Sequence, residues 1–99
     1  MNIDREYLDY AIKQIIDLCS IPSPAGFTKH AEEYLIKEFE NLGYKTVHSK
    51  KGSVIVDLGG EGNGLVLAAH IDTLGAMVRS VKENGRLRLT KIGFYPENN

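Results

Sequence analysis

An apolar run, Leu65–Ala69, ends directly in His70-Ile71-Asp72 and limits the folds open to this 99-residue chain more than any other segment. A short continuous apolar run is typical of a strand that is buried on both faces of a sheet. Because side chains two residues apart on a strand point to the same face, we expect His70 and Asp72 to lie together where the strand leaves the sheet. Ligands of open α/β sheets gather outside the carboxyl ends of strands, so this pair is the first candidate for a functional site.

A histidine followed two residues later by a carboxylate predicts a role in metal binding. The imidazole of His70 would ligate the metal, and the carboxylate of Asp72 would orient the ring and raise its basicity. A catalytic zinc takes about three protein ligands, so one histidine leaves such a site incomplete. The residues alone also allow a structural alternative, in which the two side chains form a polar pair at a strand end and hydrogen-bond to nearby backbone.

Two amphipathic helices are predicted before this motif, over residues 4–19 and from Thr28 to about Leu42. The apolar residues of the first helix recur at the spacing of one helical face and are expected to be buried: Leu8, Ala11, Ile12, Ile15, Ile16 and Cys19. The charged residues of the second helix are expected to face solvent: Lys29, Glu32, Glu33, Lys37 and Glu40. Prolines and a glycine in segment 20–26 predict an extended, turn-rich connection between the helices.

Strands are predicted where apolar and β-branched residues alternate or run together between turn residues. They lie at residues 44–48, 53–58, 65–70, 75–82 and 86–92, and residues 50–52 suit a hairpin turn between the first two. The last two form a hairpin with one polar face, whereas the strand at 65–70 is expected to be buried on both faces. This change of environment near residues 73–75 predicts a domain boundary.

The composition is that of an ordinary water-soluble globular domain with a modest core, since 42% of the residues are hydrophobic and 25% are charged. The net charge of −1 gives no basic excess for nucleic acid, and no apolar run approaches the length of a membrane span. The single Cys19 excludes an internal disulfide and suits a reducing compartment. We therefore expect a cytoplasmic protein without nucleic-acid or membrane partners.

These motifs together resemble the tetrahedral (TET-type) metallo-aminopeptidases, the glutamyl aminopeptidase family. The resemblance is carried, in order along the chain, by residues 21–26, 68–78, 84–87 and 91–93. It implies an α/β fold: the N-terminal part of a zinc-peptidase-like α/β/α domain, with two helices and about three strands, that runs into the first hairpin of an inserted β-rich dimerisation domain. Residues 1–73 would begin the catalytic domain and residues 74–99 the inserted domain, both incomplete.

The resemblance implies a metal-dependent aminopeptidase, which releases N-terminal residues from peptides by means of a metal-activated water. His70 matches a metal ligand and Asp72 the catalytic acid that orients it, and the full-length subunit would bind two divalent ions, zinc or cobalt. Thr73 departs from the family, which often has an acidic residue there. The other ligands and the glutamate base would lie beyond Asn99, so we expect this fragment to be inactive and to bind no metal tightly.

A peptide is the expected substrate, and other copies of the subunit are the expected partners. At full length the subunits would form a large assembly, and the fragment would form a dimer or a strand-exchanged form.

Two other interpretations stay open. Related metallo-carboxypeptidases and deacylases also carry a His-x-Asp motif after a buried strand, but they usually continue with a Val-Pro-like turn. Here residues 73–78 continue straight into a strand, which favours the aminopeptidase. The third interpretation is a non-catalytic α/β module that associates with itself to cover unpaired strand edges.

Overall fold

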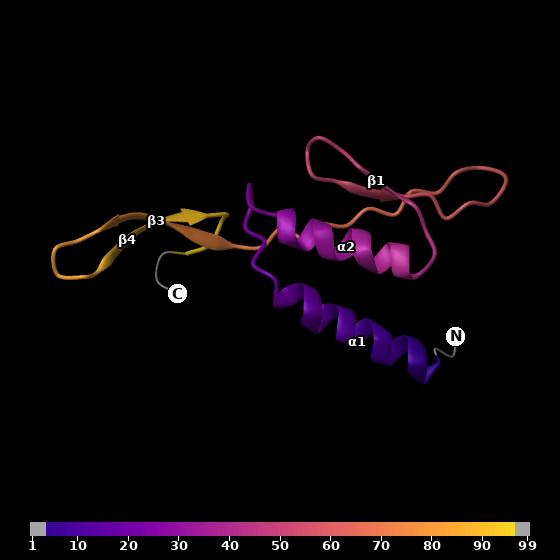
Figure 1. Ribbon diagram of the computed structural model, residues 1–99, viewed down its shortest axis with the longest axis horizontal. Coiled ribbons are helices and arrows are strands. Elements are labelled where there is room, and N and C mark those ends of the chain that lie inside the picture. Colours follow the sequence, from indigo (N-terminus) through magenta and orange to yellow (C-terminus); the bar gives the residue numbers. More distant parts are fainter. Residues whose placement is uncertain (1–3, 97–99) are drawn as a thin grey trace.

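The computed structural model describes residues 4–96, in which two helices and two separate two-stranded antiparallel sheets follow one another along the chain (Figure 1). The elements are α1 (Arg5–Cys19), α2 (Lys29–Asn41), β1 (Thr46–His48), β2 (Val54–Val56), β3 (Gly75–Val81) and β4 (Leu87–Ile92). Both predicted helices and four of the five predicted strands are confirmed. The division at residue 73 stays a prediction, and residues 1–3 and 97–99 of its two ranges lie outside the described residues.

Helices α1 and α2 lie side by side and meet through polar side chains (Figure 1). The Tyr10 hydroxyl donates a hydrogen bond to Glu38 at 2.7 Å, and the Tyr34 hydroxyl shares its one proton between Gln14 at 2.9 Å and Asp17 at 3.1 Å. Because Tyr10, Gln14 and Asp17 share one face of α1, the apolar face of that helix points away from α2. The prediction that this apolar face and Cys19 are buried was wrong: Leu8, Ile12, Ile15, Ile16 and Cys19 are exposed.

The β1–β2 hairpin packs against α2, and its turn is formed by residues 49–53. Val47 pairs with Ile55 at the centre of the hairpin, and the Gly52 amide donates to the Ser49 carbonyl at 3.0 Å. Gly52 has a φ of 89°, which falls in the left-handed region that favours glycine. The predicted turn at residues 50–52 is therefore confirmed.

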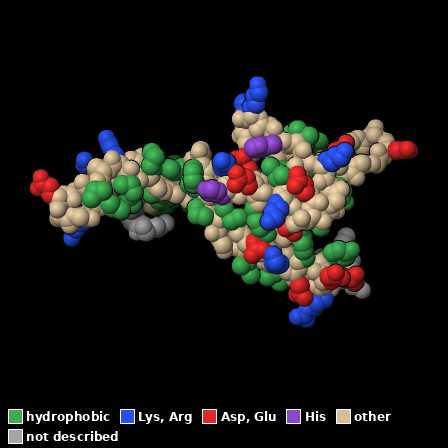
Figure 2. Space-filling view, viewed as in Figure 1, with side chains coloured by type: hydrophobic (Ala, Val, Ile, Leu, Met, Phe, Trp, Pro, Cys, Tyr) green, Lys and Arg blue, Asp and Glu red, His purple; other side chains and the backbone are tan. Residues whose placement is uncertain are grey.

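The β3–β4 hairpin contains a β-bulge that keeps four of its apolar residues, Val78, Val81, Leu87 and Leu89, on one face. Val78 pairs with Leu89 and Ser80 pairs with Arg88, so Arg79 is the extra, unpaired residue. The extra residue brings Val81 onto the same face as Val78, although the two are an odd number of residues apart. The hairpin extends from the helices as an arm with one apolar face, and hydrophobic side chains are visible on its surface (Figures 1 and 2).

The predicted buried strand at residues 65–70 is wrong for this structure. This segment is extended but belongs to neither sheet, and the side chains of Leu65, Val66 and Leu67 are 84–87% exposed. A strand is stabilised by hydrogen bonds to a neighbouring strand, and no strand of the described residues pairs with this segment. The sequence pattern therefore marks an apolar segment that lacks its partner within residues 4–96.

The described residues form almost no hydrophobic core, so the expectation of a modest core was also wrong. Ala31 is the one buried hydrophobic residue among them, and the two buried polar residues are Ser23 and Glu32. The radius of gyration is 18.0 Å, against about 13 Å for a compact chain of this length. Within residues 4–96, neither helix has both the length and the apolar composition required to cross a bilayer.

Candidate metal-ligand pair at the end of the apolar run

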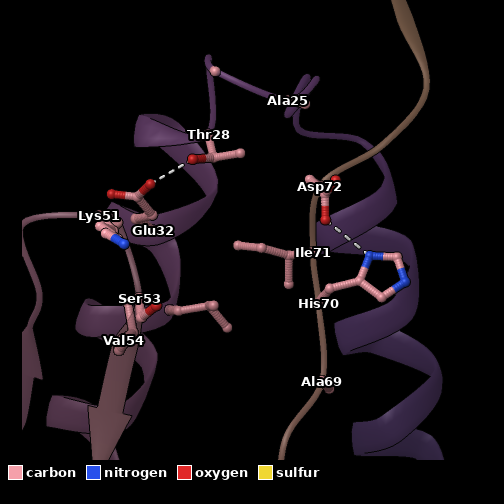
Figure 3. Close-up of a pocket in the computed structure, with 13 residues that line it drawn as sticks. Ala25, Thr28, Glu32, Lys51, Ser53, Val54, Ala69, His70, Ile71 and Asp72 are labelled. Carbon is pink, nitrogen blue, oxygen red and sulfur yellow. Dashed lines mark hydrogen bonds and ion pairs between the residues drawn. The ribbon is translucent and has the colours of Figure 1, made fainter. Parts of the chain in front are cut away.

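The sequence-predicted pair, His70 and Asp72, is brought together as the strand-like spacing requires. Nδ1 of His70 lies 2.9 Å from Oδ1 of Asp72, within hydrogen-bond distance. The two side chains project from one side of the extended segment, and the side chain of Ile71 projects from the opposite side (Figure 3). The expectation that His70 and Asp72 share a face is therefore confirmed, although the segment is not part of a sheet.

This hydrogen bond determines which nitrogen of His70 is available to a ligand. A carboxylate accepts hydrogen bonds but does not donate them, so Nδ1 of His70 carries the proton in this contact. In the neutral ring, Nε2 then has a free lone pair, which is the form of imidazole that binds a metal ion. The His70 side chain is 84% exposed, so Nε2 is open to solvent.

The His70–Asp72 pair has the geometry of one metal ligand with its orienting carboxylate, but it does not make a complete metal site. A histidine whose second nitrogen donates to a carboxylate is the usual arrangement around a protein-bound zinc. The described part of the chain contains no group of three or more His, Cys, Asp or Glu side chains that could hold a metal ion together. Residues 4–96 can therefore supply one corner of a metal centre and not a closed one.

The backbone on both sides of Asp72 is held by the connection between the helices. The Ser23 hydroxyl donates to the Ile71 carbonyl at 2.7 Å, and the Thr73 amide donates to the Ser23 carbonyl at 2.8 Å. Pro24 forms a parallel β-bridge with Thr73. The residue before a proline is restricted to extended conformations, which suits Ser23 to this pairing of two extended segments.

A cleft of about 410 Å³ lies between the segment Ala69–Asp72 on one side and α2 with the β1–β2 turn on the other. Ile71 points into this cleft, whereas the imidazole of His70 projects from the other side of the segment (Figure 3). The cleft is therefore not where the lone pair of His70 points. We place the candidate metal-binding position on the outer, solvent-facing side of residues 70–72.

The opposite wall of the cleft contains a buried carboxylate, Glu32 of α2. Its side chain accepts a hydrogen bond from the Thr28 hydroxyl and lies 2.7 Å from Nε2 of His48 on β1. These contacts with Thr28 and His48 lower the pKa of the Glu32 carboxyl, although burial acts in the opposite direction. The prediction that Glu32 faces solvent was wrong, because the β1–β2 hairpin covers this part of α2.

The sequence analysis did not identify Ser23, Glu32 or His48 as residues of interest. Ser23 contacts a carbonyl 48 residues away, and Glu32 contacts a ring 16 residues away. Such contacts leave no periodic signal in the sequence. For Ser23 a partial signal existed, because a serine between two prolines has a rigid, extended backbone that is ready to pair.

Comparison with known proteins places this geometry in context. A sequence model described as M42 glutamyl aminopeptidase matches residues 52–98, which include His70 and Asp72. A Bacillus subtilis (strain 168) protein named "Putative aminopeptidase YhfE" is 40% identical over 86 residues, which cover 85% of this chain and 25% of that protein.

Two further relatives show the range of names among similar proteins. The "Glutamyl aminopeptidase" of Lactococcus lactis subsp. cremoris is 29% identical over 81 residues, covering 79% of this chain and 23% of that protein. A Pyrococcus furiosus protein named "Putative LysW-lysine/LysW-ornithine hydrolase" is 37% identical over 70 residues, covering 71% of this chain and 22% of that protein. The chain thus spans about a quarter of the length of the curated relatives it matches.

Proposed function

Because the chain belongs to the M42 glutamyl aminopeptidase family, we propose that it forms the first part of a metal-dependent aminopeptidase in which His70 is a metal ligand and Asp72 its orienting acid. The observation that supports this most directly is the 2.9 Å contact between Nδ1 of His70 and the Asp72 carboxylate. In this proposal residues 1–73 begin the catalytic domain, and residues 74–99 begin an inserted dimerisation domain.

Each residue of the pair has a distinct task in the proposed mechanism. Asp72 keeps the proton on Nδ1 of His70, which leaves Nε2 available and holds the ring in one orientation. His70 would then hold one of two divalent ions, zinc or cobalt, in the complete protein. When bound, such ions lower the pKa of a water molecule and polarise the scissile carbonyl of the peptide.

The 99-residue chain alone is expected to be inactive and to bind zinc more weakly than about micromolar. The physical reason is that a catalytic zinc takes about three protein ligands, whereas the proposal gives this chain one. Calorimetric titration of the chain with zinc, together with an assay on amino-acid anilides, measures both properties. Affinity of micromolar or tighter that His70→Ala abolishes would contradict this expectation.

A chimera gives the direct test of the aminopeptidase proposal. In it, this chain replaces the matching segment of the Bacillus subtilis relative, to which it is 40% identical over 86 residues. We expect metal-dependent release of N-terminal residues from peptides, lost to background in His70→Ala. Asp72→Asn should reduce metal affinity or activity by about 10–100-fold, the usual effect of removing the partner of a metal-bound histidine.

Histidine 30 provides the matched control in this chimera. His30 is an exposed residue of α2, 3.8 Å from Glu33 and outside the candidate pair. His30→Ala should leave the activity unchanged. Full activity in the His70→Ala chimera would exclude His70 as a metal ligand, and an inactive parent chimera with correctly folded protein would count against the aminopeptidase itself.

The same chimera separates the aminopeptidase from a second candidate, a related metallo-carboxypeptidase or deacylase. The observation that favours keeping this candidate is the name of the Pyrococcus furiosus relative, a LysW-lysine/LysW-ornithine hydrolase. Peptides with a free N-terminus and peptides with an acylated N-terminus or free C-terminus are assayed in parallel. Preference for the free N-terminus supports the aminopeptidase, and the reverse preference supports the alternative.

We also propose a cytoplasmic location and association with further copies of the subunit. The support for association is the exposed apolar face of α1, the exposed run at Leu65–Leu67 and the apolar face of the β3–β4 hairpin. Exposed apolar surface of this extent is typical of proteins whose partner surface is missing. A non-catalytic self-associating module shares this feature, and the chimera assay distinguishes it by activity.

A further inference from the structure

We propose that Ser23 is the positioning residue that holds His70 and Asp72 in register, through a clamp on the backbone on both sides of Asp72. The inference rests on the proposed function of the pair, but its geometry stands independently of any metal ion. We use the term Ser23 clamp for the contacts of Ser23 and Pro24 with residues 71–75.

The first argument for the clamp is the burial of Ser23. It is 1% exposed, and it has the largest fully buried side chain of the described residues, in a chain that otherwise buries very little. A buried hydroxyl needs a hydrogen-bond partner, and Ser23 finds it in the Ile71 carbonyl at 2.7 Å. The most enclosed polar group of the described chain is thus directed at the peptide group that joins Ile71 to Asp72.

The second argument is that the clamp acts on both sides of Asp72. The Ser23 hydroxyl binds the carbonyl of Ile71, and the Ser23 carbonyl accepts from the amide of Thr73 at 2.8 Å. Asp72 is therefore fixed between two anchored residues, and His70 lies one residue before the first. Because no strand within the described residues pairs with residues 65–70, no sheet hydrogen bonds of this part of the chain hold the pair from that side.

The third argument is the close approach of Pro24 to Gly75. A β-carbon added at Gly75 would lie 2.7 Å from the β-carbon of Pro24, closer than two carbons can pack. Glycine at position 75 therefore allows the connection between the helices to lie against residues 73–75. Gly75→Ala disturbs the clamp from its far side and leaves Ser23, His70 and Asp72 unchanged in sequence.

The consequence for His70 is a defined tautomer. Nδ1 of His70 meets Asp72 with both side chains projecting from the same side of an extended backbone (Figure 3). If the clamp opens, residues 70–73 gain rotational freedom, and the imidazole is no longer held with its proton on Nδ1. The metal-binding nitrogen, Nε2, would then be protonated for a larger fraction of the time.

Nitrogen NMR of the imidazoles in the metal-free 99-residue chain measures this tautomer directly. We expect His70 to hold its proton mainly on Nδ1 in the unsubstituted chain. In Ser23→Ala and in Gly75→Ala the population should move toward that of a free histidine. A merely structural role of Ser23 would lower stability without moving the His70 tautomer.

Each variant has a matched control in the same chain. Ser20→Ala removes a hydroxyl that donates to the Ile16 carbonyl at 2.7 Å, on α1 and away from the pair. Gly64→Ala adds a β-carbon at a position where the described residues, apart from its two chain neighbours, place no heavy atom within 4 Å. Neither control should change the tautomer of His70. An unchanged His70 in either Ser23→Ala or Gly75→Ala, or an equal change in the controls, overturns the proposal.

Hydrogen exchange in the unsubstituted chain decides the matter if the variants lose their helices. The Thr73 amide should exchange more slowly than the amides of residues 65–67, which have no hydrogen-bond partner among residues 4–96, because it donates to Ser23. Equal exchange rates overturn the clamp. The outcome is also separable from the proposed function, since loss of activity in His70→Ala tests the metal ligand and the tautomer tests Ser23.

Discussion

Glu32 occupies a helix position among charged, exposed neighbours, yet its own side chain is nearly enclosed. The Thr28 hydroxyl and the His48 ring surround its carboxylate, and the turn at Gly52 closes over it. Both hydrogen bonds stabilise the ionised form, so the pKa of Glu32 lies below its ordinary value of 4.5. The other charged or titratable groups that line the cleft, or a second hollow between the start of α2 and the β1–β2 turn, are Lys29, Lys50, Lys51 and the His70–Asp72 pair.

The depressed pKa of Glu32 predicts a loss of stability in acid. A carboxyl whose folded pKa is below its unfolded value stabilises the fold above the unfolded pKa, about 4.5 here, and the stabilisation is lost as the pH falls through the folded pKa. Unfolding followed by circular dichroism from about pH 7 to about pH 3 should show this fall. Glu32→Gln should flatten it, whereas Glu33→Gln on the exposed face of α2 should not.

A pH profile of Glu32→Gln that matches the unsubstituted chain would contradict this assignment. Some acid dependence should persist in every variant, because Asp17 also has a lowered pKa, through its contacts with Lys13 and Tyr34.

At the scale of residues, local spacing predicted the His70–Asp72 contact correctly. It could not predict Glu32, His48 or Ser23, whose partners are brought close only by the path of the chain.

The turn between β1 and β2 shows how one element depends on a single glycine. Gly52→Ala should destabilise the chain by at least about 1–2 kcal/mol, the cost of a left-handed conformation for an L-residue, since Gly52 has a φ of 89°. The added β-carbon would also lie 2.5 Å from the Glu32 carboxylate, so the measured loss should exceed this conformational cost. Denaturant unfolding of the variant measures the change.

Gly26→Ala is the control for this prediction. Gly26 also has a left-handed φ, of 84°, but its added β-carbon would meet no heavy atom of the described residues within 4 Å, its two chain neighbours aside. An equal loss of stability in the two variants would show that the contact with Glu32 contributes nothing.

The elements also show why sequence patterns succeed for some segments and fail for others. The helices and both hairpins depend on neighbouring residues in the chain, such as Gly43 after α2 and Gly85 in the β3–β4 turn, and they were predicted correctly. A strand at 65–70 depends on hydrogen bonds to another strand, which no described residue provides. The apolar face of α1 was likewise identified correctly, while its burial was not.

The described part of the chain is extended, with principal dimensions of 61 × 33 × 24 Å (Figure 1). Apolar side chains are left uncovered on α1, on residues 65–67 and on the β3–β4 arm. Isolated two-stranded hairpins are marginally stable in water and normally pack against a further layer. The fold class could be predicted from the sequence, but the missing core could not, because patterns report which residues prefer burial and not what covers them.

Self-association of the 99-residue chain is the expected result of this exposed apolar surface. Light scattering should show a mass that rises above the monomer with concentration. Replacing Ile15 and Ile16 together by Gln should weaken the association, and replacing the polar, exposed Lys37 by Gln should not. A monomer at high concentration would argue against association through these surfaces.

The β3–β4 arm begins at Gly75, immediately beyond the point where Thr73 is held by Ser23 and Pro24. This contact is the point at which the arm is attached to the rest of the described chain. A force applied to the far end of the arm would act on this contact before it acts on Asp72 or His70. The contacts of Thr73 with Ser23 and Pro24 thus stand between the His70–Asp72 pair and the most protruding part of the molecule.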